Sequence, residues 1–324
     1  MIADAISKIN IILIKNHLNA LFYTPEIVLM LTKKIIPCLV AGAACIANIS
    51  YAADTDNLTP AEMEKIAKMT ANPVGAAWML WTQYDNTQIR GDKFSGTVSR
   101  TTFQPVMSFP LKFGQSDWNF IVRPVLQYYN TPDLGHVSTK SNGSVVAHGR
   151  ASGMGDTGLL TLLGPNKEDG FVWGVGATQI FDTAENDFQG QGRYQVGPAL
   201  LVAKLAPHPG GTNVGVLAQH WWSADNKSNR KDTSHTDIQY FINYRLSGTE
   251  LVGMSPDITI DWKKDQGDRL TLPIGLGYSN VIKMGKLPVS FAVELQYSIV
   301  SPDDTGTRWN MKFMFIPVLP SPFI

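Results

Sequence analysis

The feature that most constrains this chain is an alternation of apolar and polar residues with period two, which continues from Gly75 to the C-terminus. In residues 286–299, for example, apolar Val289, Phe291 and Val293 alternate with polar or small residues. Successive side chains of a β-strand point to opposite faces of the sheet, so the pattern predicts strands with one apolar face. We therefore predict an all-β chain.

Clusters of Gly, Asn, Asp and Pro divide this region into segments of 10–14 residues. Soluble strands average about 5–6 residues, so the segments favour strands that cross a membrane. Segment 155–164 is apolar on both faces, which indicates either a strand beside a lumen-filling element or a total of ten or fourteen strands. We predict twelve strands, over residues 75–86, 98–110, 117–130, 155–164, 170–181, 193–205, 212–222, 234–246, 251–262, 268–280, 286–299 and 308–319.

Two further features favour a membrane barrel over a soluble sandwich. Trp118 and Tyr128 bracket one apolar face and lie ~33 Å apart along a strand, or ~25 Å when it is tilted, the height of a barrel's apolar band. Short connections such as 165–169 alternate with longer ones, namely 87–97, 131–154, 182–192 and 223–233. Hydrocarbon cannot satisfy an open sheet edge, so the sheet must close. The prediction is a transmembrane antiparallel up-and-down β-barrel of about 12 strands.

The N-terminus has the pattern of a secretory signal peptide. Lys33 and Lys34 precede the apolar stretch 35–49, and small residues then predict cleavage after Ala52. An anchor helix that is never cleaved is the alternative. Because about thirty residues precede the basic pair, we also expect translation to begin at Met30. Residues 1–52 are thus assigned to the signal, 53–74 to a periplasmic segment and 75–324 to the barrel.

A short helix is predicted inside the periplasmic segment. Thr59 is a suitable N-cap, Pro60 suits the first helical position, and Glu62 completes a capping box. We expect the helix to reach about Met69 and to stop before Pro73. Its weakly amphipathic pattern favours a helix on the protein surface, and the alternative is a helix that plugs the lumen.

Composition and motifs exclude several classes of function. Lysine and arginine number 27 against 27 acidic residues, which argues against nucleic acid as a partner. Both cysteines, Cys38 and Cys45, lie in the predicted signal, so thiol catalysis and disulfides are not expected. The sequence has neither a Gly-x-Ser-x-Gly elbow nor a His-Glu-x-x-His motif. We therefore expect no enzyme activity, no catalytic residues, no metal and no cofactor.

Charged residues on the polar rows are the candidates for a solute path, because charges at a constriction orient or select what passes. The alternative is that they pair and pack the lumen shut. The lumen-facing candidates are Arg100, Arg123, Asp237, Arg245, Asp257, Asp261, Arg269, Glu294, Arg308 and Lys312. The aromatic residues assigned to interfacial girdles are Trp118, Tyr128, Trp221, Trp222, Tyr278, Tyr297 and Trp309. His220, beside two of them, is assigned to the same girdle in preference to a binding site.

Several short stretches resemble a family of outer-membrane transporters named after the meta-pathway of phenol degradation. They are Gly155-Asp156-Thr157-Gly158, Trp173-Gly174-Val175-Gly176, Gly190-Gln191-Gly192, Val196-Gly197-Pro198, Gln219-His220-Trp221-Trp222, Tyr240-Phe241-Ile242-Asn243-Tyr244 and Leu272-Pro273-Ile274-Gly275-Leu276-Gly277. The resemblance covers roughly residues 72–324. It implies a barrel in the outer membrane of a Gram-negative bacterium and import of aromatic or other apolar compounds.

The expected function is therefore an outer-membrane channel or transporter for small molecules. A non-transporting barrel, acting as an adhesin, receptor or structural element, is the alternative, and an outer-membrane hydrolase is less favoured. The expected partners are membrane lipid and lipopolysaccharide, an unknown small-molecule solute, and the outer-membrane insertion machinery. That machinery reads a C-terminal aromatic residue, which here is the penultimate Phe323.

Overall fold

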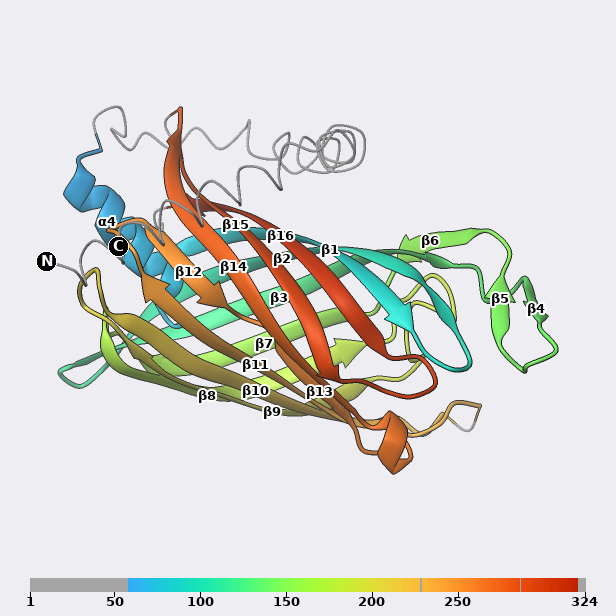
Figure 1. Ribbon diagram of the computed structural model, residues 1–324. Coiled ribbons are helices and arrows are strands. Elements are labelled where there is room, and N and C mark those ends of the chain that lie inside the picture. Colours follow the sequence, from blue (N-terminus) through green and yellow to red (C-terminus); the bar gives the residue numbers. More distant parts are fainter. Residues whose placement is uncertain (1–57, 228, 286, 320–324) are drawn as a thin grey trace, which may run out of the picture. The chain divides into compact units, whose positions relative to one another are not determined.

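The structure is a computed structural model that describes residues 58–227, 229–285 and 287–319. Its described part is a short helix followed by a closed antiparallel β-barrel (Figure 1). The elements are α4 (Pro60–Ala71), β1 (Trp78–Arg90), β2 (Ser95–Phe113), β3 (Ser116–Pro132), β4 (Val137–Thr139), β5 (Val145–Ala147), β6 (Arg150–Met154), β7 (Thr157–Pro165), β8 (Gly170–Phe181), β9 (Gln195–Leu205), β10 (Thr212–Ser223), β11 (Ser234–Arg245), β12 (Glu250–Met254), β13 (Asp257–Asp261), η3 (Gln266–Asp268), β14 (Leu270–Met284), β15 (Leu287–Val300) and β16 (Thr307–Leu319). The predicted signal peptide and Phe323 lie outside the described residues.

The twelve-strand prediction is confirmed for the described part of the chain. Neighbouring strands pair antiparallel in sequence order, and β1 pairs with β16 to close the barrel. Two of the twelve barrel strands are interrupted, so that β6 and β7 together form one barrel strand and β12 and β13 together form another. The short pair β4–β5 is a hairpin within a connecting loop, at the end of the barrel opposite α4 (Figure 1). No helix within the described ranges is long and apolar enough to cross a membrane.

The first long connection differs from expectation. Residues 87–97 were expected to form a loop, but β1 and β2 stay paired as far as Arg90 and Ser95 and leave a turn of only four residues. The consecutive polar residues Asn86, Thr87 and Gln88 still pair with β2 beyond the apolar band. They can do so because the hydrogen bonds between strands are made by the backbone and do not depend on which side chains are apolar. The strands of this hairpin therefore extend past the membrane-facing part of the wall.

The outer surface of the barrel is apolar. Phe120, Leu200 and Ile242 have exposed fractions of 36%, 49% and 44%, and Leu276 reaches 66%. Their neighbours in sequence are less exposed: Ile121 and Leu201 are fully buried. An apolar band of this kind, on a closed sheet with no free edge, is suited to contact with hydrocarbon.

The inner face departs from a uniformly polar wall. In the half nearest the short turns, the interior is packed with apolar side chains, and this core includes Val74 from the segment that follows α4. Segment 155–164 was apolar on both faces because Leu160 and Leu162 belong to this core. The reading of that segment as a strand beside a lumen-filling element thus agrees with the structure.

The N-terminal helix has the capping box read from the sequence. The Thr59 hydroxyl accepts a hydrogen bond from the Glu62 backbone N–H, and the Glu62 carboxylate accepts one from the Thr59 backbone N–H at 2.7 Å. That backbone hydrogen bond, with a second from the Thr59 hydroxyl, lowers the pKa of Glu62. The helix ends two residues later than expected, at Ala71, and lies against β14 and β15.

Candidate functional site: the barrel interior

A short segment packs into the apolar half of the interior. Asn72, Val74 and Ala77 are 2%, 0% and 1% exposed. The Asn72 side-chain amide donates to the carbonyl of Lys167 at 2.6 Å, and the Asn119 amide on β3 donates to the carbonyl of Val74 at 2.8 Å. The sequence pattern favours a surface helix over a plugging one. In the structure α4 lies at the barrel end, and residues 72–77, hereafter the plug, lie inside.

Next to the plug is an apolar chamber of about 170 Å³. Its wall combines aromatic, aliphatic and thioether side chains from strands around the barrel, among them Trp81, Leu160, Leu217, Phe241, Met314 and Ile316. Thr70 and Pro73 contribute the face on the plug side. Apolar surface predominates in this lining, although Arg123, Glu294 and several amide and hydroxyl side chains also contribute, so the chamber suits an apolar molecule better than an ion.

A second chamber, of about 180 Å³, is polar. Glutamine and threonine side chains line it together with four charged residues, Arg100, Arg123, Asp237 and Asp257. Arg123, Leu160 and Gln239 line both chambers, so the two adjoin. The interior therefore changes from polar to apolar along the barrel axis, and Arg123 lies at the change.

Most charges in the interior are paired. Arg100 contacts Asp85 at 3.1 Å, and Lys312 contacts Asp257 at 3.6 Å. Asp85 also accepts hydrogen bonds from the amides of Gln83 and Asn310. Among the described residues, Arg123 and Asp237 have no hydrogen-bond or ion-pair partner. The alternative that the charged residues pair with one another thus applies to Arg100, Asp257 and Lys312. The other two, which have opposite charges, face the polar chamber.

An interruption in the barrel wall explains two of the buried charges. The strand is interrupted at Ser255–Pro256, between β12 and β13, because proline has no N–H group to donate to a neighbouring strand. The Ser255 N–H donates to the Glu294 carboxylate at 3.0 Å, and its carbonyl accepts from the Lys312 ammonium at 3.0 Å. Glu294 and Lys312, 3% and 1% exposed, thereby satisfy backbone groups that the neighbouring strand leaves unpaired.

The same interruption leaves a stretch of the wall, hereafter the unpaired stretch, without backbone hydrogen bonds between β14 and β12–β13. Pairing of β14 with β12 ends at Gly277, and pairing with β13 begins again at Thr271. Between these points the Gly275 N–H donates to the Met254 sulfur at 3.4 Å, and the Tyr240 hydroxyl donates to the Pro273 carbonyl at 2.7 Å. Side chains therefore replace the backbone ladder over this stretch, beside the apolar chamber.

Four of the ten lumen candidates lie away from the chambers. Arg245 contacts Glu64 of α4 at 3.4 Å, at the short-turn end. Arg269 donates to the Lys264 carbonyl in the loop after β13, and Asp261 ends that strand. Arg308 lies 6.0 Å from the centre of the Tyr297 ring. The remaining six are brought together, namely Arg100, Arg123, Asp237, Asp257, Glu294 and Lys312.

One girdle assignment is wrong. Trp221 is 8% exposed, lines the polar chamber and stacks on His235 with ring centres 5.0 Å apart. Adjacent strand residues face opposite sides, so only Trp222, 49% exposed, lies on the outer surface. His220 donates to or accepts from the Thr236 hydroxyl at 2.7 Å and lies beside the Trp222 ring.

The other aromatic residues lie in small clusters. Trp118 makes edge contacts with Phe113 and Trp173 near the short-turn end, and Tyr297 packs on Trp309 at 4.6 Å near the other. Tyr128 is 48% exposed, and the Tyr278 hydroxyl donates to Glu250. Their role as membrane girdles stays a prediction.

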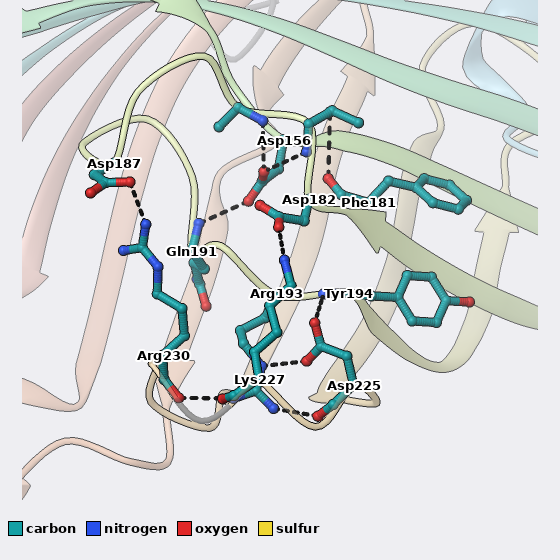
Figure 2. Close-up of polar contacts among 12 residues, drawn as sticks. Asp156, Phe181, Asp182, Asp187, Gln191, Arg193, Tyr194, Asp225, Lys227 and Arg230 are labelled. Atoms are coloured by element: carbon teal, nitrogen blue, oxygen red, sulfur yellow. Dashed lines mark hydrogen bonds and ion pairs between the residues drawn. The ribbon is translucent and has the colours of Figure 1, made fainter.

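Two outer loops are clamped together around one buried arginine (Figure 2). Arg193, 2% exposed, donates to the Asp225 carboxylate and to the carbonyls of Asp225, Lys227 and Arg230, the last at 2.9 Å. A hydrogen bond from the Tyr194 N–H, followed by those from Arg193, lowers the pKa of Asp225. These contacts join loop 182–194 to loop 224–233; we call them the loop clamp. No sequence pattern predicts it.

Surface ion pairs extend the loop clamp. Lys227 contacts Asp182, and Arg230 contacts Asp187 (Figure 2). Asp156, in the break between β6 and β7, accepts hydrogen bonds from the backbone N–H groups of Ala184 and Gln191. Three separate segments at the barrel mouth are therefore held in one arrangement. Within residues 58–227, 229–285 and 287–319, no group of three or more acidic or histidine side chains is placed to hold a metal ion.

Comparisons with known proteins identify the fold. No family model and no curated protein matches the chain. An outer membrane channel from Pseudomonas putida F1 is 12% identical, with a TM-score of 0.57 over 83% of this chain and 99% of that one. The beta domain of the Bordetella autotransporter BrkA is 10% identical, with a TM-score of 0.41 over 75% of this chain and 100% of that one. The resemblance to the phenol meta-pathway family stays a prediction.

The likeness to the P. putida channel agrees with the barrel described above. A closed β-barrel with an apolar outer surface has one natural location, because hydrocarbon tolerates only sheets without free edges. Such barrels belong to the outer membrane of Gram-negative bacteria, with short turns in the periplasm and longer loops outside. The chain is accordingly an outer-membrane barrel, and its plug is at the end with the short turns.

Proposed function

We propose that the protein is a gated outer-membrane channel for small apolar molecules. The observation that carries this is the apolar chamber inside the barrel, lined by Trp81, Phe241 and Met314. Its volume of about 170 Å³ is comparable with the engineered cavity of about 150 Å³ that binds benzene. An apolar body of about one aromatic ring would fill it.

The position of the chamber supports transport rather than storage. It adjoins a polar chamber on the side of the outer loops and the plug on the periplasmic side. Intact lipopolysaccharide is the barrier that a small apolar molecule meets at the cell surface, and the barrel interior bypasses it. Either the plug or the unpaired stretch of the wall between β12–β13 and β14 would then have to move to release the solute.

A removable crosslink between plug and wall tests this function. A β-carbon added at Gly174 would lie 3.1 Å from Cγ1 of Val74, close to the distance of about 3 Å between a β-carbon and the far sulfur of a disulfide. The Val74→Cys, Gly174→Cys double variant should therefore oxidise readily. The two native cysteines lie in the predicted signal and do not compete.

Uptake is measured in Gram-negative cells rather than phospholipid vesicles, because apolar solutes cross phospholipid unaided. Cells that carry the unaltered protein should take up radiolabelled toluene faster than cells without it, whereas glycerol uptake changes little. Oxidation should block toluene uptake by the double variant, and reduction should restore it. The two single variants are matched controls. Equal uptake with and without the protein would refute the function, and an active oxidised double variant would refute gating by the plug.

A second candidate, binding of a partner at the cell surface, is favoured by the β4–β5 hairpin. This hairpin projects from the outer end of the barrel (Figure 1). Val137 in the hairpin and Leu134 just before it are 44% and 43% exposed. Deletion of residues 134–148 removes the hairpin and keeps β6. Loss of surface attachment with unchanged toluene uptake would identify this role.

A further inference from the structure

Two opposite charges inside the barrel lack partners. Arg123 on β3 and Asp237 on β11 both line the polar chamber, and within the described residues neither makes a hydrogen bond or an ion pair. Their neighbours are engaged, since Asp257 contacts Lys312 and Asp85 contacts Arg100. Both side chains are half-buried, and a charged group that faces a chamber without a protein partner is available to a molecule that enters that chamber.

The two charges are placed where the chambers meet. Arg123 lines both the polar and the apolar chamber, whereas Asp237 lines only the polar one. Asp257 and, less strongly, Asp237 attract Arg123 through space without contacting it. A molecule whose apolar body fills the apolar chamber would therefore present its head group to both residues at once.

We propose that this junction is a binding site for a small amphiphile with an apolar body and a zwitterionic head, as in an apolar α-amino acid. The head carboxylate would accept paired hydrogen bonds from the Arg123 guanidinium, and the head ammonium would donate to the Asp237 carboxylate. This inference rests on the proposed function, because it uses the same apolar chamber, and it names the class of solute.

Charge balance selects the zwitterion over simpler heads. A carboxylate alone would satisfy Arg123 but leave Asp237 as an unpaired anion beside it. An ammonium alone would satisfy Asp237 but leave Arg123 unpaired. A hydroxyl can bond to both but neutralises neither. Only a head with both signs gives each residue an opposite charge and leaves the net charge of the interior unchanged.

Four ligands with the same phenyl body test the proposal. They are phenylalanine, 3-phenylpropionate, 2-phenylethylamine and 2-phenylethanol, whose heads are zwitterionic, anionic, cationic and neutral. Their binding to the full-length protein in detergent is measured by calorimetry, with protein-free micelles as the blank. Phenylalanine should bind at least about tenfold more tightly than each of the others, since charged hydrogen bonds on both sides add to its affinity.

Substitutions then assign each half of the head. Arg123→Gln should weaken phenylalanine and 3-phenylpropionate by about tenfold or more and leave 2-phenylethylamine unchanged. Asp237→Asn should weaken phenylalanine and 2-phenylethylamine and leave 3-phenylpropionate unchanged. Lys112→Gln and Asp117→Asn, at exposed positions near the short-turn end, are the matched controls and should change nothing. The ligand series on the unaltered protein decides the question even where a variant fails to fold.

The outcomes separate this inference from the function on which it rests. If 2-phenylethanol binds as tightly as phenylalanine, or if one singly charged ligand binds most tightly, the zwitterion site is refuted while an apolar channel stands. If none of the four binds, the chamber does not accept a phenyl body and both proposals fail.

Discussion

The loop clamp provides a quantitative test of how the outer mouth is held. Arg193→Met removes a buried guanidinium and keeps much of its aliphatic volume. The unaltered side chain donates to the Asp225 carboxylate and to three carbonyls, at 2.6 Å for Asp225, 3.2 Å for Lys227 and 2.9 Å for Arg230. It also forms an ion pair with Asp232 at 3.1 Å. Breaking a buried ion pair on one side costs about 3–5 kcal/mol.

This energy appears as local opening, because the barrel itself does not depend on the clamp. Hydrogen exchange measures such opening amide by amide. The Tyr194 N–H, bonded to Asp225, and the Ala224 N–H, bonded to the Tyr194 carbonyl, report on it. Since about 1.4 kcal/mol corresponds to a factor of ten, both amides should exchange roughly 100-fold faster or more in Arg193→Met.

The control is Arg230→Met, which removes an ion pair with Asp187 on the surface. Exposed pairs contribute about 0–1 kcal/mol, so exchange at the same amides should rise by less than about fivefold. Amides within β9 and β10 should not change in either variant. If Arg193→Met accelerates the loop amides no more than Arg230→Met does, the buried arginine does not hold the loops and the reasoning fails.

Three further predictions follow from the interior and the loops. Val74→Asp places a charge in the apolar core and should displace the plug, so planar bilayers should show a higher single-channel conductance; an unchanged conductance would mean that residues 72–77 do not obstruct the path. Lys312→Met leaves the carboxylates around Ser255 uncompensated and should lower stability by about 3–5 kcal/mol, seen as a lower thermal unfolding midpoint, whereas the exposed Lys112→Met should not. The pKa of Asp225 is lowered from its ordinary 3.8, so its contribution to the clamp is complete above that value and disappears as pH falls through the lowered pKa. A protection factor of the Tyr194 amide, relative to an unstructured peptide, that already falls near pH 5 would contradict this.

The sequence predicted the barrel because hydrogen-bonded strands and one apolar face leave a signal in every segment. Alternation through Trp118, Phe120 and Val122 depends only on local geometry, and it favoured twelve strands over ten or fourteen without knowledge of their partners. The capping box of α4 was equally local, since Thr59 and Glu62 are one turn apart.

The interior was harder to predict, because what fills a lumen comes from distant parts of the chain. Leu160 and Leu162 signalled an unusual inner wall, but their partner Val74 lies far away in sequence. Trp221 could have been assigned correctly, because two adjacent tryptophans on one strand cannot both face lipid. Arg193 carried no signal, since its partners are two carboxylates more than thirty residues away and backbone carbonyl groups that any residue possesses.

The plug is joined to the barrel by a very short connection. Val74 precedes the first residue of β1, Trp78, by four positions, and β1 is held on both sides by β2 and β16. Four residues span at most about 14 Å. The plug can thus move out of its site but stays tethered next to it. Its return is intramolecular, so the rate of closing is independent of protein concentration and requires no partner protein.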